Sequence, residues 1–220
     1  MRTIVIAVLD VGSPAKLGWC RVLKAGNQAL QANAGVGDGR LLEGLVQVIG
    51  EDLLANRSVA LGFEAPLFVP LPVAADHLGK GRVGEGNRPW SAASGAAVMA
   101  YAAQQVVWVL TALSHRTREH QLRVGFDPVA WRRGHLNLLL WEAFLSGAAK
   151  DRSSANPHVE DARAAAREFL HRFEADSLKS DLADRTVFSL VGAAILRAGL
   201  SSDMRLLAQA PLVIRAPDLR

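Results

Sequence analysis

The sequence predicts an α/β protein in which a mixed sheet is flanked by helices. Short apolar runs typical of buried strands occur near residues 3–10, 59–63 and 136–141. Segments between them have the spacing of apolar residues expected of helices, most clearly over 40–54 and 92–115. Half of the 220 residues are hydrophobic, which is enough to fill a sizeable core.

The first expected strand, about residues 3–10, ends at Asp10, and a glycine-containing turn leads to a return strand at about 18–24. A weaker third strand is expected at 27–33. A carboxylate at the end of a buried strand and close to glycine contributes little to a core. We therefore interpret Asp10 as a site residue, with an ordinary β-turn aspartate as the alternative.

The strand at 59–63 leads to Glu64, and a loop rich in proline and glycine follows over 65–90. A loop of this length is uncommon unless it is functional or disordered. Ser91 fits the N-cap of the helix at 92–115. The remaining expected elements are a short strand at 122–126, a strand at 136–141 that ends at Glu142, helices at 159–174 and 188–200, and an edge strand at 212–214.

Composition narrows the functional class. No apolar run approaches the roughly 20 residues of a membrane-spanning helix, and the N-terminus does not resemble a secretory signal. Cys20 is the single cysteine, which excludes a disulfide framework and a thiolate metal cage. We therefore expect a cytoplasmic protein that does not insert into a membrane.

Basic residues are unevenly distributed, although the net charge is only +4. Arginine greatly outnumbers lysine, a bias that suits phosphate contacts and is also produced by a GC-rich genome. One cluster of basic residues, Lys80, Arg82 and Arg88, lies in a single loop. A second cluster, over 115–135, is equally compatible with polyanion binding or a solvated surface: His115, Arg116, Arg118, His120, Arg123, Arg132, Arg133 and His135.

The loop before the helix at 92–115 carries candidate phosphate-binding residues. Lys80 and Arg82 lie in a glycine-rich stretch that could form a mobile flap. Arg88 could bind a phosphate through two parallel hydrogen bonds, and Ser91 stands where free backbone N–H groups of a helix can bind an anion. Trp90 could stack on a base or fill the core.

Acids end three of the expected strands: Asp10, Glu64 and Glu142. A further pair, Glu160 and Asp161, begins a helix. If the three strands are parallel neighbours, their acids meet at one edge of the sheet, where open α/β sheets bind ligands. Clustered carboxylates repel one another, and Mg²⁺ or Mn²⁺ offsets that repulsion. The alternatives are a salt-bridged strand end for Glu64, an exposed residue for Glu142, and helix-dipole stabilisation for the last pair.

Several of these motifs resemble the ribonuclease H-like superfamily. The segment Val8-Leu9-Asp10-Val11-Gly12-Ser13, followed by Gly18-Trp19, resembles its first hairpin, most closely in RuvC-type resolvases and in bacterial predicted-nuclease families of unknown function. Residues 59–66 and 138–144 resemble its fourth and fifth strands, and His158 to Ala162 resembles the start of its last helix. The predicted-nuclease families often have Asp-x-Pro where this chain has Glu64-Ala65-Pro66.

The resemblance covers about residues 3–174 and implies a mixed five-stranded sheet of order 3-2-1-4-5. It implies metal-dependent cleavage of nucleic acid, with Asp10, Glu64 and Asp161 as metal ligands and Glu142 as a ligand or orienting residue. We expect a ribonuclease H-like domain at 1–174 and a C-terminal helical extension, 175–220, packed on that domain.

The sequence predicts a divalent-metal-dependent nuclease or related phosphodiesterase that acts on nucleic acid. A nucleotide-binding protein of the actin and sugar-kinase type is one alternative, because Asp10 to Ser13 also resembles the first phosphate loop of those proteins. A non-catalytic interaction module on the same fold is the other. In that case the acids are structural and the apolar C-terminal helix binds a partner or forms a homodimer.

Overall fold

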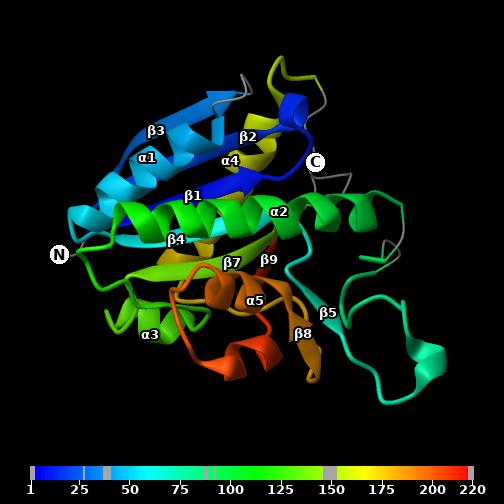
Figure 1. Cartoon of the computed structure of the whole chain (residues 1–220). Coiled ribbons are helices and arrows are strands. Elements are labelled where there is room, and N and C mark those ends of the chain that lie inside the picture. Colours follow the sequence, from blue (N-terminus) through cyan, green and yellow to red (C-terminus); the bar gives the residue numbers. More distant parts are fainter. Residues whose placement is uncertain are drawn as a thin grey trace.

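A central, mostly parallel sheet organises the protein, seen in a computed structural model that describes residues 3–26, 28–36, 41–86, 89–91, 93–145 and 153–217 (Figure 1). The seven-stranded sheet has the path β3-β2-β1-β4-β7-β6, with β9 also paired to β7. The two hairpin pairings β1–β2 and β2–β3 are antiparallel, and β1–β4, β4–β7, β6–β7 and β7–β9 are parallel. The strands are β1 (Ile4–Asp10), β2 (Gly18–Ala25), β3 (Gln28–Val36), β4 (Ser58–Glu64), β6 (Val124–Gly125), β7 (Leu138–Phe144) and β9 (Leu212–Arg215).

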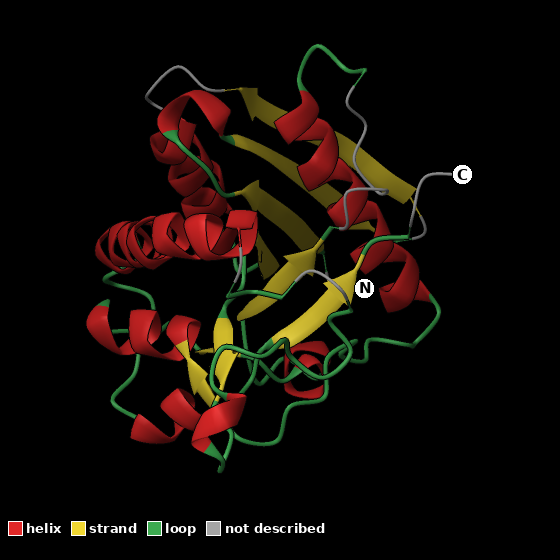
Figure 2. Cartoon of the chain, turned by 90° about the vertical axis from the view of Figure 1, so that its right-hand side faces the viewer, coloured by secondary structure: helices red, strands yellow, loops and turns green. Residues whose placement is uncertain are grey.

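Five α-helices among the described residues cover the two faces of this sheet (Figure 2). Side chains alternate between the faces of each strand, so one strand supplies two cores. Val5, Ala7 and Leu9 of β1 pack in a cluster with α1, α2 and α5, whereas Ile6 and Val8 pack in a second cluster with α4. The helices are α1 (Leu41–Leu54), α2 (Ala93–Arg116), α3 (Pro128–Arg132), α4 (Pro157–Glu174) and α5 (Leu190–Arg197).

The outer edge of β7 is shared by two short strands, β6 and β9, which correspond to the strands expected at 122–126 and 212–214. With them the main sheet has seven strands rather than the expected five. β6 pairs with Leu138 and Leu139 at the start of β7, and β9 pairs with its last four residues. The C-terminal extension therefore adds a strand to the main sheet as well as α5. The long segment after β4 contains β5 (Phe68–Pro70), which forms a separate antiparallel pair with β8 (Val187–Ser189). Three 3₁₀ turns complete the described elements: η1 (Pro14–Lys16), η2 (Ala75–His77) and η4 (Met204–Ala208).

Helix α2 requires a correction to the expectation from hydropathy. Its segment Gly95–Arg116 is long and apolar enough, by length and composition, to cross a membrane. The many alanines of this segment raise its mean hydropathy, and 33% of the segment is buried inside the protein. Val109, Leu110 and Leu113 nevertheless pack in the core beside α1 and α5. A core helix of a soluble protein passes the same test of length and hydropathy, so this composition alone is weak evidence for a membrane span.

Candidate metal site

Asp10 and Glu64 end two adjacent parallel strands in register. β1 pairs with β4 from Ile4 opposite Ser58 through to Asp10 opposite Glu64. Because paired residues of parallel strands point to the same face, and because Leu9 and Phe63 both enter the α1/α2 core, Asp10 and Glu64 face α4. Asp10 and Glu64 therefore lie side by side at one edge of the sheet, as the sequence analysis expected.

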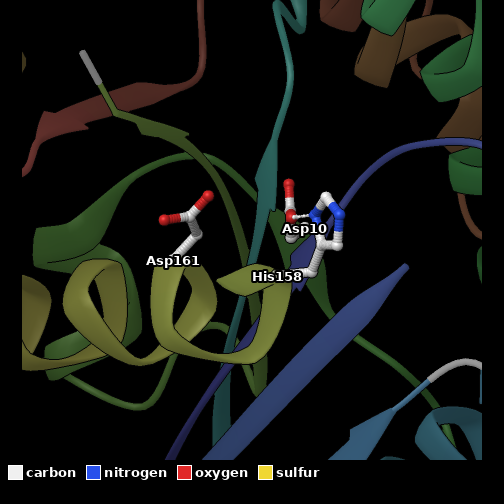
Figure 3. A group of neighbouring side chains, drawn as sticks. All are labelled: Asp10, His158 and Asp161. Carbon is white, nitrogen blue, oxygen red and sulfur yellow. Dashed lines mark hydrogen bonds and ion pairs between the residues drawn. The ribbon is translucent and has the colours of Figure 1, made fainter. Parts of the chain in front are cut away.

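Helix α4 brings two more ligand-type side chains to the same place (Figure 3). Pro157 occupies the first turn, where its missing N–H costs nothing. His158 and Asp161 are three residues apart and therefore lie on one face of the helix. The His158 Nδ1 atom contacts Asp10 Oδ2, and Asp10, His158 and Asp161 each offer a ligand atom within 4.8 Å of the others. We call these three residues the Asp–His–Asp group.

Gly18 explains how α4 comes so close to the end of β1. This residue of β2 lies opposite Asp10 in the hairpin. A Cβ atom built on Gly18 would lie 2.5 Å from the His158 carbonyl carbon and 2.6 Å from the Val159 nitrogen. Both are backbone atoms, which cannot rotate away. The glycine therefore allows the first turn of α4 to rest on the hairpin, beside Asp10.

The donor set of the Asp–His–Asp group suits a cation. Asp10 and Asp161 are buried, and the carboxylate oxygens of such acids are the ligands that Mg²⁺ and Mn²⁺ prefer, while an imidazole nitrogen is also accepted by Mn²⁺ and other transition metals. The N-terminus of α4 adds partial positive charge that favours these acids. The buried Asp–His–Asp group could therefore hold a metal ion, with the half-buried Glu64 on the same face of the neighbouring strand.

Glu142 does not join this group, and its predicted convergence with Asp10 and Glu64 is wrong. It pairs with Phe63, not Glu64, and thus points to the opposite face of the sheet. There its Oε2 accepts hydrogen bonds from the Leu67 N–H at 2.9 Å and from Arg82 Nη1 at 2.8 Å. A shift of one residue along a strand reverses the face that a side chain occupies, so an acid one register position away serves a different purpose.

Arg82 is a buried anchor, which contradicts its assignment to a phosphate-binding flap. Its Nη2 atom lies 2.8 Å from Glu142 Oε1 and 2.8 Å from Glu85 Oε1, and all three side chains are enclosed. Burial raises the pKa of Glu142, an effect that the Arg82 guanidinium opposes. Burial alone lowers the pKa of Arg82, but the two carboxylates raise it and keep the guanidinium charged. We call Arg82, Glu85 and Glu142 the Glu142 anchor.

Further hydrogen bonds join the two ends of the segment 79–91, which contains Arg82 and Glu85. Trp90 Nε1 donates to the Lys80 carbonyl oxygen at 3.1 Å, and the Ser91 hydroxyl donates to the Gly79 carbonyl oxygen. The Ser91 hydroxyl therefore donates to the Gly79 carbonyl oxygen of this segment rather than capping a helix or binding a phosphate. Lys80 is exposed and keeps its ammonium group at the surface. Arg88 lies outside the described residues, and its predicted contact with phosphate stays a prediction.

The basic cluster of 115–135 lies at the other end of the strands. Gln105, in the middle of α2, donates a hydrogen bond to the Gly12 carbonyl oxygen. α2 then continues to Arg116, which lies 3.7 Å from Glu51 near the end of α1. Arg123 then adjoins Asn137, which immediately precedes β7. The cluster is therefore separated from Asp10 by the length of a strand, roughly 20 Å, and does not line the Asp–His–Asp group.

His158 is the site residue that sequence reasoning did not select. The histidines of this chain lack the His-x-x-x-His spacing of a metal-binding helix, so no such motif marks His158. Its signal is the three-residue spacing to Asp161 in a first helical turn after proline, which places an imidazole and a carboxylate side by side.

The sequence matches no family model, and neither the curated proteins nor the solved structures contain a match.

Proposed function

We propose that the protein is a divalent-metal-dependent phosphodiesterase acting on nucleic acid, built on a ribonuclease H-like fold. The observation that carries the proposal is the meeting of Asp10, His158 and Asp161 within 4.8 Å, beside Glu64 on the adjacent strand. The strand path β3-β2-β1-β4-β7, with two antiparallel pairings followed by parallel ones, also supports the fold assignment, since it corresponds to the order 3-2-1-4-5.

The proposed roles follow from position. Asp10, Glu64 and Asp161 would hold Mg²⁺ or Mn²⁺, and the imidazole of His158 would orient the Asp10 carboxylate or act as a further ligand. A bound divalent ion activates a water molecule and stabilises the leaving oxygen in phosphodiester cleavage. The burial of Asp10 and Asp161 limits the competition of bulk water for the charges of the site.

The test measures metal binding and cleavage separately in the full chain. Metal-free protein is titrated with Mn²⁺ while its melting temperature is recorded, and cleavage of labelled single-stranded DNA, duplex DNA and RNA is followed with Mn²⁺ or Mg²⁺. We expect Mn²⁺ to stabilise the wild type by about 2.7 kcal/mol at a hundredfold excess over Kd. Asp10→Asn should lose both the stabilisation and the cleavage.

Asp203→Asn is the matched control, because this acid caps η4 and pairs with Arg205 at the surface. It should keep both signals. Unchanged cleavage by Asp10→Asn would exclude the proposed site. Absence of both Mn²⁺ stabilisation and cleavage in the wild type would favour the non-catalytic interaction module, and tight ATP binding would favour the nucleotide-binding alternative.

A further inference from the structure

A pocket lies at the opposite end of the strands from the Asp–His–Asp group. It has a volume of about 220 Å³ and is formed where β1, β2 and β4 meet α3 and the end of α4. Ile4 and Ser58 begin β1 and β4, the strands that Asp10 and Glu64 end. We call it the α3 pocket; its lining includes Ile4, Lys24, Ser58, Trp131, Arg132 and Phe173.

The walls of the α3 pocket are mainly apolar and aromatic. Trp131 is buried and packs edge-to-face with Phe173, with ring centroids 5.7 Å apart. Such rings prefer to meet further aromatic rings in offset or edge-to-face arrangements. Ligand pockets for drug-sized molecules range over roughly 300–1,000 Å³, so the smaller α3 pocket fits a molecule of one or two rings.

Ser58 supplies an independent observation that points to a ligand. Its side chain is 1% exposed, and its hydroxyl oxygen finds no hydrogen-bond partner in the described part of the chain. Buried hydroxyl groups are nearly always hydrogen-bonded, because burial without a partner is costly. A polar group of this kind in an apolar pocket is what fixes the orientation of a small molecule.

The charges around the α3 pocket favour an uncharged ligand. Lys24 contacts Glu174, and Arg132 Nη1 lies 2.6 Å from Asp176 Oδ1, so each cation at the rim already has an acid. Arg132 also stacks on the Phe173 ring, with its guanidinium carbon 4.3 Å from the ring centroid. An anionic ligand would have to displace these carboxylates, whereas a neutral ring need not.

We propose that the α3 pocket binds a small, planar, uncharged heteroaromatic molecule that exchanges a hydrogen bond with Ser58. Indole serves as the probe, since it is bicyclic and has one N–H donor, and 1-methylindole serves as the matched probe without that donor. Binding to the ¹⁵N-labelled full chain is followed by NMR. We expect saturable shifts of the amides of Lys24, Ser58 and Arg132 with indole.

Ser58→Ala removes the hydroxyl without filling the pocket, and the loss of an unpartnered buried group should leave the fold intact. It should weaken indole binding by roughly three- to tenfold, the value of one hydrogen bond, and leave 1-methylindole unaffected. Asp10→Asn should not alter indole binding, which separates this proposal from the metal site. Shifts that do not saturate, that map elsewhere, or that persist with equal affinity in Ser58→Ala would overturn the proposal.

Discussion

Asp10 and Glu142 lie near the ends of two strands on either side of β4, yet they face opposite sides of the sheet and have different partners. Asp10 contacts the imidazole of His158 on the α4 side. Glu142 faces the α1/α2 side, where the Arg82 guanidinium pairs with it through two nitrogens. An arginine that holds two buried carboxylates fixes a loop, whereas carboxylates grouped with an imidazole keep a donor set that a cation can use.

The largest expected effect is on cleavage, when the acid on one face of the sheet or the other is neutralised. Asp161→Asn should lower Mn²⁺-dependent cleavage at least roughly a hundredfold, because the metal contributes several kcal/mol to stabilising the transition state. Glu142→Gln should keep cleavage within a few-fold at a temperature where it remains folded. Cleavage rates at saturating Mn²⁺ give the measurement, and circular dichroism confirms the fold of each variant. The reverse ranking would mean that Glu142, and not Asp161, serves the reaction.

The second prediction concerns stability on the Glu142 face. Arg82→Met keeps an apolar stem but leaves Glu85 and Glu142 buried without their cation, and we expect a loss of about 3–5 kcal/mol in the free energy of unfolding. Arg57→Met is the control, because Asp52 retains Arg21 and the Arg57 side chain is 37% exposed. It should lose less than about 1 kcal/mol.

Urea unfolding of both variants measures the difference. The Mn²⁺ affinity of the folded Arg82→Met protein should stay within a few-fold of the wild type, since the Asp–His–Asp group lies on the other face. A stability loss no larger than that of Arg57→Met would show that the anchor contributes little. A large fall in Mn²⁺ affinity would couple the two faces.

The sequence predicted the ends of β1 and β4 because each is an apolar run closed by a single acid. The face of Glu142 could not be predicted in the same way. Its strand, Leu138 to Phe144, is apolar on both faces, so the alternation of side chains does not reveal which face Glu142 occupies. The burial of Arg82 was equally hidden, because Glu85 is a local partner but Glu142 is 60 residues away in sequence. Long-range pairing of this kind follows from tertiary packing alone.

The third prediction tests how α4 is positioned. Gly18→Ala places a methyl group against the backbone of His158 and Val159, so the first turn of α4 must shift. We expect a loss of about 1–3 kcal/mol in stability and a weaker Mn²⁺ affinity, because His158 and Asp161 move relative to Asp10. Thermal melting with and without Mn²⁺ measures both effects.

Gly44→Ala is the control for that substitution. Gly44 lies within α1, and a Cβ there meets only Trp19 at 3.8 Å, an ordinary contact. Alanine should therefore stabilise the helix by up to about 1 kcal/mol and leave Mn²⁺ binding unchanged. If Gly18→Ala bound Mn²⁺ as tightly as Gly44→Ala, the close approach of α4 to β2 would not set the geometry of the Asp–His–Asp group.

The smallest expected effect concerns Cys20, which lies in β2 on the α4 face. Burial raises the pKa of its thiol, and Arg163 offsets part of this shift. Because the folded-state pKa exceeds the unfolded one, the contribution of the thiol to stability is complete below about pH 8.5 and declines as the pH rises towards the folded pKa. Between pH 7 and pH 9.5 the wild type should lose up to about 1.4 kcal/mol more than Cys20→Ala.

Urea unfolding at the two pH values gives this difference for each protein, and the alanine variant corrects for all other titrating groups. A thiol reagent supplies an independent measurement at pH 8: Cys20 should react slowly in the native protein and stoichiometrically in urea, since the thiolate is the reactive form and burial suppresses it. Rapid labelling of the native protein would mean that the contact between β2 and α4 opens readily. The same opening would separate His158 from Asp10, so this reagent also reports on how firmly α4 holds the Asp–His–Asp group.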